Sequence, residues 1–215
     1  MPKLLYISMM RLPTEKAHGL QIVQNCEAFA DAGYDVTLWV ARRINTPEMR
    51  TITDPYAYYG VRPNFKIRRV PCLDLFPLFV PDSKGAQLAF YVQMLSYIVT
   101  MTVALLFTSA DIYYSRDETL LAVLSRFKAK AKIAYEAHLF SPTQRGASLQ
   151  RQVMSRVGSV IAITPKLCAD LIAQRGADPD RVIVAHDGIR ESRFVDAPDG
   201  LTARRVLGWD DAAFI

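Results

Sequence analysis

Two residues that could bind a sugar or a phosphate stand close together in the second half of the chain. Glu136 and His138 are two residues apart, at the end of an apolar run that predicts a strand over residues 132–136. Successive side chains of a strand point to opposite faces, so this spacing puts the carboxylate and the imidazole on the same face. Such a pair suits hydrogen bonding to a sugar hydroxyl or a diphosphate. A purely structural role for a single loop histidine is the alternative, and the spacing does not decide between the two.

A second candidate lies near the amino terminus, where His18 and Gly19 precede an amphipathic pattern. We expect a helix there that buries Val23 and Cys26 and ends near Gly33. The first N–H groups of a helix lack intrahelical partners and carry the positive end of its dipole, so they can bind phosphate. The alternative is that Gly19 only permits a tight turn and that His18 is solvated.

Several common catalytic motifs do not occur in the sequence. No Gly-x-Gly-x-x-Gly follows the first apolar run, and there is no Gly-x4-Gly-Lys-Ser/Thr loop or Gly-x-Ser-x-Gly elbow. The 3 histidines and 3 cysteines do not show the close pairing of a zinc site. We therefore expect neither a dehydrogenase nor a P-loop NTPase, and no metal.

The candidate residues need a scaffold that brings them together, and the pattern of elements predicts one. Apolar β-rich runs alternate with helical patterns, which is typical of a mostly parallel sheet with helices on both faces. We expect an α/β, Rossmann-like fold, with an insertion-like loop over residues 42–69. The predicted strands cover residues 3–8, 35–41, 66–70, 112–115, 132–136, 160–163 and 182–185. The later predicted helices cover residues 87–107, 118–127, 148–156, 165–175 and 202–207.

Ligands of such folds bind outside the carboxyl ends of the strands, which selects the loops that could form a site. Polar or charged groups occupy each of them: residues 9–19, 42–46, 116–117, 137–146, 164 and 186–190. Besides Glu136, we take Arg116, Asp117 and Thr164 as candidate rim or acceptor contacts.

The composition places the chain among ordinary globular proteins. Of its 215 residues, 51% are hydrophobic and 22% are charged, so the chain can bury a core. Its formal net charge of +5 favours anionic partners, with a solvated basic surface as the alternative. Cys26, Cys72 and Cys168 have apolar or helical neighbours and indicate buried, reduced thiols of a cytoplasmic protein. The apolar run after Lys3 is too short for a secretory signal.

One long stretch, residues 85–110, contains no charged residue. About 20 apolar residues suffice to span a bilayer, so length alone allows a membrane span. Gln87, Gln93 and several Ser and Thr residues lie within the stretch, and no cluster of Lys and Arg flanks it. We therefore favour a core helix or a helix that lies at an interface.

The order of several sequence blocks resembles the amino-terminal half of the retaining glycosyltransferases of family 4. The resemblance spans nearly the whole chain and rests on the blocks KLLYISMMRLPTEKAHGLQIVQNCEAFADAGYDVTLWVARR, YYGVRPNFKIRRVPCLDL, IYYSRDETLLAVL, IAYEAHLF and VIAITPKLCADLIAQRGADPDRVIVAHDGI. It implies the GT-B fold, in which two Rossmann-like domains face a cleft. The amino-terminal domain of that fold mainly binds the acceptor, and the carboxy-terminal domain binds the nucleotide sugar.

The resemblance also implies roles for individual residues. Gly19 matches the glycine of the loop that approaches the donor diphosphate, with His18 beside it, and His138 matches the histidine that contacts the transferred sugar. Glu136 lies in the same block as a rim residue. Two departures occur: the family often has paired glycines where this chain has His18-Gly19, and an Asn-Gly-Val-Asp block where residues 186–190 read HDGIR.

For the whole molecule, the resemblance implies an acceptor-side domain over residues 1–195 and a linker over residues 196–215 that leads to a donor-binding domain absent from this chain. We expect a nucleotide sugar as donor, a glycan or glycolipid as acceptor, no cofactor, and a hexosyltransferase of the cell envelope that works in the cytoplasm or at the inner face of the membrane. The chain alone is expected to be inactive, because the cations that stabilise the leaving group belong to the other domain.

A function of another class is also open. The chain would then be a non-catalytic module that supports a partner glycosyltransferase at an anionic membrane. The uncharged stretch and the basic residues Arg68, Arg69, Lys128, Lys130 and Lys132 would provide the contact. Nucleic acid is not an expected partner, because these basic residues are not interleaved with stacking aromatic residues.

Overall fold

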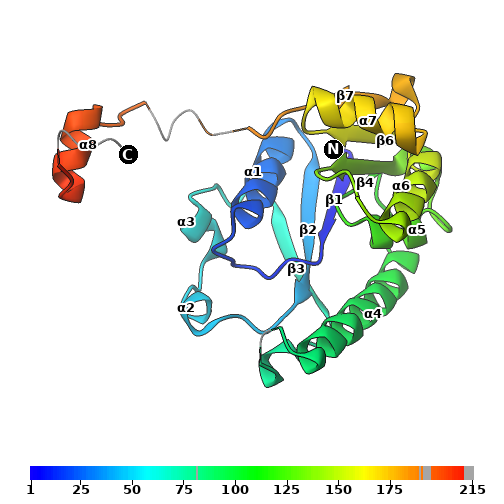
Figure 1. Ribbon diagram of the computed structural model, residues 1–215, viewed down its shortest axis with the longest axis horizontal. Coiled ribbons are helices and arrows are strands. Elements are labelled where there is room, and N and C mark those ends of the chain that lie inside the picture. Colours follow the sequence, from blue (N-terminus) through cyan, green and yellow to red (C-terminus); the bar gives the residue numbers. More distant parts are fainter. Residues whose placement is uncertain (81, 189, 191–194, 211–215) are drawn as a thin grey trace.

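A computed structural model shows a seven-stranded, all-parallel sheet in the order β3-β2-β1-β4-β5-β6-β7, with helices packed against both faces (Figure 1). The structure describes residues 1–80, 82–188, 190 and 195–210. The predicted α/β, Rossmann-like fold is confirmed. The strands are β1 (Lys3–Ser8), β2 (Asp35–Arg42), β3 (Lys66–Pro71), β4 (Ile112–Ser115), β5 (Ile133–Ala137), β6 (Ser159–Ala162) and β7 (Val182–Val184).

Helices connect the strands in the crossovers that parallel pairing requires. The α-helices are α1 (Ala17–Asp31), α2 (Pro47–Arg50), α3 (Pro55–Tyr59), α4 (Lys84–Leu106), α5 (Glu118–Leu124), α6 (Gln144–Arg156), α7 (Pro165–Arg175) and α8 (Gly200–Leu207). Short 3₁₀ turns are η1 (Phe76–Leu78), η2 (Lys130–Lys132) and η3 (Pro179–Arg181).

The alternation of side chains along β1 shows how the sheet separates two cores. Leu4 and Tyr6 pack with residues of α1 on one face, and Leu5 and Ile7 pack with residues of α4 and α5 on the other. All four side chains are buried. A strand that is apolar on both faces reads as a continuous hydrophobic run, which is why residues 3–8 predict a central parallel strand.

The insertion-like loop expected over residues 42–69 contains two short helices that the sequence analysis missed. Thr46 and Asp54 accept hydrogen bonds from the first turns of α2 and α3, and a proline follows each of them. A capping side chain followed by proline is a helix-start signal, but here it precedes only one turn of helix, too short for a periodic apolar pattern.

The uncharged stretch forms α4, which contributes one side to the core. Gln93, Tyr97, Met101 and Leu105 are fully buried, whereas many residues of its other side are exposed. By length and composition, α4 is a helix that could cross a membrane, with a mean hydropathy of 1.7 over its most apolar window. In the structure, however, its inner side fills the space between the sheet and α5.

The cysteines are free thiols, but burial is complete only for Cys26, and the prediction of buried thiols is wrong for Cys72 and Cys168, which are half-buried. Cys72 lies just after edge strand β3, where neighbours cover it on one side only.

In the predicted linker, residues 196–210 are described and include α8, and residues 211–215 lie outside the described residues. Ile189 of the HDGIR block also lies outside them.

Candidate functional site

The candidate site lies at the carboxyl edge of the sheet, where β1, β4 and β5 end side by side. Strands β1, β2 and β3 lie side by side in chain order, and β4 lies on the other side of β1. Helices that follow β1 and β4 therefore diverge, and a crevice forms at this edge in folds of this kind. The register pairs Ser115 with Tyr135, so the next residues, Arg116 and Glu136, are neighbours across the two strands.

A bidentate ion pair joins these two side chains. Arg116 Nε donates to Glu136 Oε2 at 3.0 Å, and Arg116 Nη2 donates to Glu136 Oε1 at 2.8 Å. The Glu136 side chain is 5% exposed and that of Arg116 is 15% exposed. Two parallel hydrogen bonds fix the relative orientation of both groups, which a single lysine contact would not do.

The histidine predicted to act with Glu136 contacts it directly. His138 Nε2 lies 2.9 Å from Glu136 Oε1, and its side chain is 24% exposed. An ionised carboxylate only accepts hydrogen bonds, so Nε2 must be the nitrogen that carries the proton. The other ring nitrogen, Nδ1, is then available to a ligand: it accepts a hydrogen bond when the ring is neutral and donates one when it is protonated. The common face predicted from the spacing of two is therefore observed.

Electrostatics keep Glu136 ionised despite its burial. Burial alone would raise the pKa of this carboxyl, but the hydrogen bond with His138 and the charge of Arg116 outweigh that effect and lower the pKa from 4.5 to about 2. Tyr6, on central strand β1, also donates a hydrogen bond to Glu136 Oε2 at 3.1 Å. Burial, followed by the negative charge of Glu136, raises the pKa of the Tyr6 hydroxyl, so it remains a donor.

Helix α1 reaches the same cluster through a residue that the sequence analysis did not single out. Gln21 Oε1 accepts a hydrogen bond from Arg116 Nη1 at 2.8 Å, and Gln21 Nε2 donates to Asp187 in the loop after β7. Gln21 lies one turn after His18, a helical spacing that places both on one side of α1. That spacing was the signal available in the sequence. No local pattern in the sequence indicates the contact of Gln21 with Arg116, which lies 95 positions away.

The first turn of α1 contains the other predicted pair, His18 and Gly19. A Cβ on Gly19 would lie 2.3 Å from Thr14 Cγ2 and 2.8 Å from the Tyr59 hydroxyl, so glycine is required where the preceding loop folds against the helix. The His18 side chain is exposed at the surface. Its pKa is lowered, first by the part of the ring that the protein shields from water and then by the positive charges of Lys16 and Arg116. The structure thus brings His18 within electrostatic range of Arg116.

Two predicted rim residues have structural roles. Asp117 accepts a hydrogen bond from the Leu120 amide and caps α5, and Thr164 accepts one from the Leu167 amide and caps α7. Burial raises the pKa of the Asp117 carboxyl. Hydrogen bonds from the Leu120 and Thr119 amides partly offset this effect. Neither residue bonds to Arg116, Glu136 or His138 among the described residues. A polar residue three before an apolar one at the start of a helix is a capping signal that the sequence already contained.

Glu136, His138 and Asp187 also meet a geometric condition for metal binding, since one ligand atom of each lies within 4.8 Å of the others. The donor set does not fit a metal ion. Both oxygens of Glu136 already accept hydrogen bonds from Arg116, whose positive charge occupies the place that a cation would take. The absence of a metal remains a prediction from the sequence.

Comparisons with known proteins agree with this architecture. No protein-family model matches the chain, and no curated protein matches it in sequence. Among solved structures, sucrose-phosphate synthase from Thermosynechococcus elongatus is similar with a TM-score of 0.66 and 14% identity, over 98% of this chain and 53% of that one. The fold is that of one GT-B domain.

Two further structures show the same similarity. Anabaena Alr3699/HepE, in complex with UDP and glucose, gives a TM-score of 0.55 and 14% identity over 97% of this chain and 50% of that one. A glycosyltransferase from Rickettsia africae gives a TM-score of 0.58 and 10% identity over 97% and 50%. The chain therefore spans about half the length of each of these proteins, and identities this low show the fold alone.

Proposed function

We propose that this chain is the amino-terminal, acceptor-side domain of a retaining glycosyltransferase that resembles family 4. The complete enzyme would transfer a hexose from a nucleotide sugar to a glycan or glycolipid of the cell envelope, in the cytoplasm or at the inner face of its membrane, without a metal ion or other cofactor. The GT-B domain fold supports this proposal, as does the complex of Anabaena Alr3699/HepE with UDP and glucose. The sequence blocks that resemble family 4 support the finer assignment.

The observation that carries the proposal is the fixed orientation of His138. Arg116 holds Glu136, and Glu136 holds Nε2 of His138, so the ring presents Nδ1 to a ligand at the carboxyl edge of the sheet. A hydrogen bond from this nitrogen to a hydroxyl of the transferred sugar would contribute to catalysis if it strengthened in the transition state. Preorganisation matters here, because a ring that is already oriented costs no reorganisation during the reaction.

The start of α1 would face the donor diphosphate in the same site. Lys16, the residue at the cap position, makes no side-chain hydrogen bond to the first turn, and that turn contains no acidic residue. A phosphate group near His18 and Gly19 would meet these amide groups and the positive end of the helix dipole. Arg116 does not supply the neutralising cation, because its charge is engaged by Glu136. The proposed donor-binding domain would supply it.

The test begins with the reading frame beyond the codon for Ile215. We expect it, or a separate chain that binds this one, to provide a second Rossmann-like domain. The complete protein should transfer a labelled sugar from a nucleotide sugar with retention, and the 215-residue chain alone should not. His138→Ala should reduce transfer, whereas His186→Ala, which removes a ring bonded to the backbone oxygen of Ile163, should not. Equal activity of the two variants would refute the role of His138.

A second candidate function is a non-catalytic module that supports a partner glycosyltransferase at a membrane. One observation favours it, namely the number of large apolar side chains exposed on α4. Loss of transfer in the folded His138→Ala variant of the complete protein would exclude this function, because a non-catalytic module would make no contribution through His138.

A further inference from the structure

The outer side of α4 carries an apolar stripe that the core does not cover. Leu88, Leu95, Val99, Val103 and Leu106 follow one another at spacings of three, four or seven residues, which places them on one side of the helix. Each is exposed, with Leu88 at 64% and Leu95 at 63%. A contiguous apolar surface of this length on a globular domain marks an interaction site.

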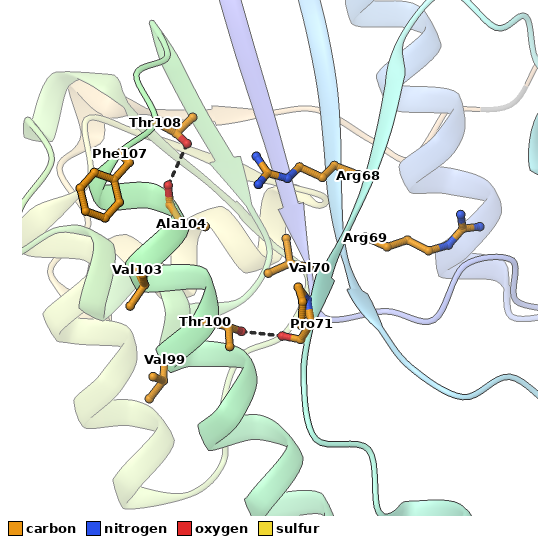
Figure 2. A pocket seen from close by; sticks show the side chains of 10 residues that line it. All are labelled: Arg68, Arg69, Val70, Pro71, Val99, Thr100, Val103, Ala104, Phe107 and Thr108. Atoms are coloured by element: carbon orange, nitrogen blue, oxygen red, sulfur yellow. Dashed lines mark hydrogen bonds between the residues drawn. The ribbon is translucent and has the colours of Figure 1, made fainter.

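The stripe borders a groove between α4 and the chain that leaves edge strand β3. Two hollows, of about 540 and 460 Å³, share Pro71, Val99 and Thr100 in their walls and are adjoining parts of this groove. Figure 2 shows the residues that line the larger hollow. Its far end is apolar and includes Leu73 and Leu95. Its near end reaches Arg68. The groove is therefore amphipathic along its length.

Arg68 provides a cation at this end of the groove. Its side chain extends toward the α4 side of the sheet. The neighbouring Arg69 also borders the hollow, but its side chain extends toward the opposite side (Figure 2), where Nη2 lies 3.5 Å from the Leu12 oxygen. The Arg68 guanidinium lies over the Trp39 ring, 4.5 Å from its centroid. No carboxylate of the described residues forms a salt bridge with Arg68, so its charge remains available to an anion.

Further cations lie at both ends of α4. Lys84 is its first residue and the only charged residue within it. At the other end, Lys128 Nζ donates to the Thr108 oxygen at 2.8 Å, and Lys132 Nζ donates to the Ala110 oxygen at 3.4 Å. Lys132 also pairs with the Asp111 carboxylate, so Lys128 is the cation at this end that forms no salt bridge with a described residue. An apolar stripe between basic ends is complementary to a surface with anionic head groups above hydrocarbon.

A bilayer contact also agrees with the way α4 is packed. Its inner side includes Tyr97, Met101 and Leu105, all fully buried against the sheet, so α4 cannot cross a membrane while the domain stays folded. It can lie flat, with Tyr91 and Phe107 at the level where aromatic side chains meet lipid head groups. Phe107, at 88% exposure, contacts little else in the domain.

We propose that the outer side of α4 rests on an anionic phospholipid bilayer, with the phosphate of one lipid at Arg68 and an acyl chain along the groove toward Leu73 and Leu95. This deepens the membrane association proposed above by assigning it a surface. That surface is on the opposite face of the sheet from α1, which contributes to the His138 site. Binding to lipid can therefore be measured without a donor, an acceptor or activity.

The experiment is co-sedimentation of the 215-residue chain with vesicles of phosphatidylcholine, with and without phosphatidylglycerol. We expect binding to the anionic vesicles, weaker binding to the neutral ones, and release from the anionic vesicles as salt shortens the Debye length from about 30 Å at 0.01 M to about 8 Å at 0.15 M. Free phosphate at the same concentration should not compete, because it provides no acyl chain. Centrifugation without vesicles controls for aggregation, and circular dichroism confirms the fold of each variant.

Two matched pairs of variants locate the contact. Arg68→Gln should weaken partitioning about five-fold, the effect of one basic residue at an anionic surface, and Arg69→Gln should change it by less than about two-fold. Leu95→Gln should weaken it about ten-fold through lost apolar burial. Ile183→Gln, which alters a side chain of 60% exposure on β7, should have little effect.

Three results would overturn the proposal. The first is the absence of binding to anionic vesicles by a folded chain. The second is an equal loss for Arg68→Gln and Arg69→Gln, which would indicate unspecific attraction by net charge. The third is concentration-dependent self-association that Leu95→Gln abolishes, without vesicle binding, because the stripe would then contact a second copy. None of these results would bear on sugar transfer by the His138 site.

Discussion

Arg116 and Glu136 meet across neighbouring strands as a buried, bidentate ion pair, with donor–acceptor distances of 2.8 and 3.0 Å. The pair does not simply add stability, since two buried charges lose hydration that their attraction must offset. Its role is positional: Glu136 orients His138, and Arg116 binds Gln21 of α1 through its remaining nitrogen. Two strands and a helix are thereby joined at one edge of the sheet.

Removal of one partner should therefore be costly. We expect Arg116→Met to lower the free energy of unfolding by about 3 kcal/mol, because Glu136 would remain buried with only Tyr6 and His138 as donors. Urea denaturation at neutral pH measures the change. Lys166→Gln, which removes an exposed pair with Asp170 on α7, should cost less than about 0.5 kcal/mol. Similar small losses for both variants would show that Glu136 does not depend on Arg116.

The lowered pKa of Glu136 predicts a specific loss of stability in acid. The pKa is about 2 in the folded domain, against 4.5 for the free side chain, so the folded state gains stability from ionised Glu136 above pH 4.5. This contribution falls as the pH decreases from about 4.5 toward 2. The decrease in this contribution between pH 6 and pH 3 should be about 2 kcal/mol. Other carboxylates titrate in the same range, so the measurement needs a variant that lacks this one.

Glu136→Gln is that variant. Its free energy of unfolding, measured with urea at both pH values, should decrease by about 2 kcal/mol less than that of the unaltered chain. Parallel pH profiles of the two proteins would mean that Glu136 titrates normally and that Arg116 and His138 do not stabilise its charge.

Gly19 should be intolerant of a larger side chain. Gly19→Ala would place a methyl group 2.3 Å from Thr14 Cγ2 and force apart α1 and the loop that Tyr59 holds through Thr14. We expect a loss of about 1–3 kcal/mol in thermal or urea unfolding. Gly188→Ala meets no atom within 4 Å and should be neutral within about 0.5 kcal/mol. An unaltered stability of Gly19→Ala would show that the loop is free to move.

Kinetics of the complete enzyme that we propose should separate two roles of His138. His138→Ala would remove the proposed hydrogen bond to the sugar and should lower kcat/KM by roughly 10–1000-fold. It also removes a partner of buried Glu136, so unfolding should become easier by about 1 kcal/mol. His138→Gln keeps an N–H group that can reach Glu136 and should restore stability but not activity. Full restoration of activity by glutamine would refute direct contact of the imidazole with substrate.

The sequence predicted the fold well because its signals are local. The central strands β1 and β4 are apolar runs that pack on both faces, and their predicted bounds coincide with the observed ones. The edge strands β3 and β7 are largely exposed. Helix α7 was equally clear, since Pro165 begins it and Gly176, with a φ of 71°, ends it. The short helices α2 and α3 lacked an apolar period and were missed.

The site was only partly predictable, for the same reason. Glu136 and His138 share a face because of a strand period that two neighbouring residues reveal. The contacts of Glu136 with Arg116 and Tyr6 join residues 20 and 130 positions apart, and no spacing rule encodes them. Asp117 and Thr164 lie at the carboxyl edge of the sheet and their side chains cap helices, and their contact with an acceptor stays a prediction.

A last prediction concerns Gln150, which no pattern in the sequence singles out. Its side chain, on α6, is fully buried and makes four hydrogen bonds. It accepts from the Ser141 amide and from Arg175 Nε, and it donates to Glu118 and to the Leu139 oxygen. Two of these bonds fasten the backbone just after His138, so Gln150 limits the motion of the loop that follows the histidine.

Gln150→Leu should therefore cost about 2 kcal/mol, because it leaves buried polar partners unpaired. The loop should also open more often, and hydrogen exchange of the Ser141 amide should become at least about ten-fold faster than the change in global stability explains. Gln152→Leu alters a half-buried glutamine on the same helix and should leave this amide protected. The guanidinium of Arg175 stacks on the Phe140 ring, with Cζ 3.7 Å from the ring centroid. If exchange at Ser141 followed global unfolding in both variants, Arg175 would be the residue that holds the loop, and Gln150 would contribute only packing.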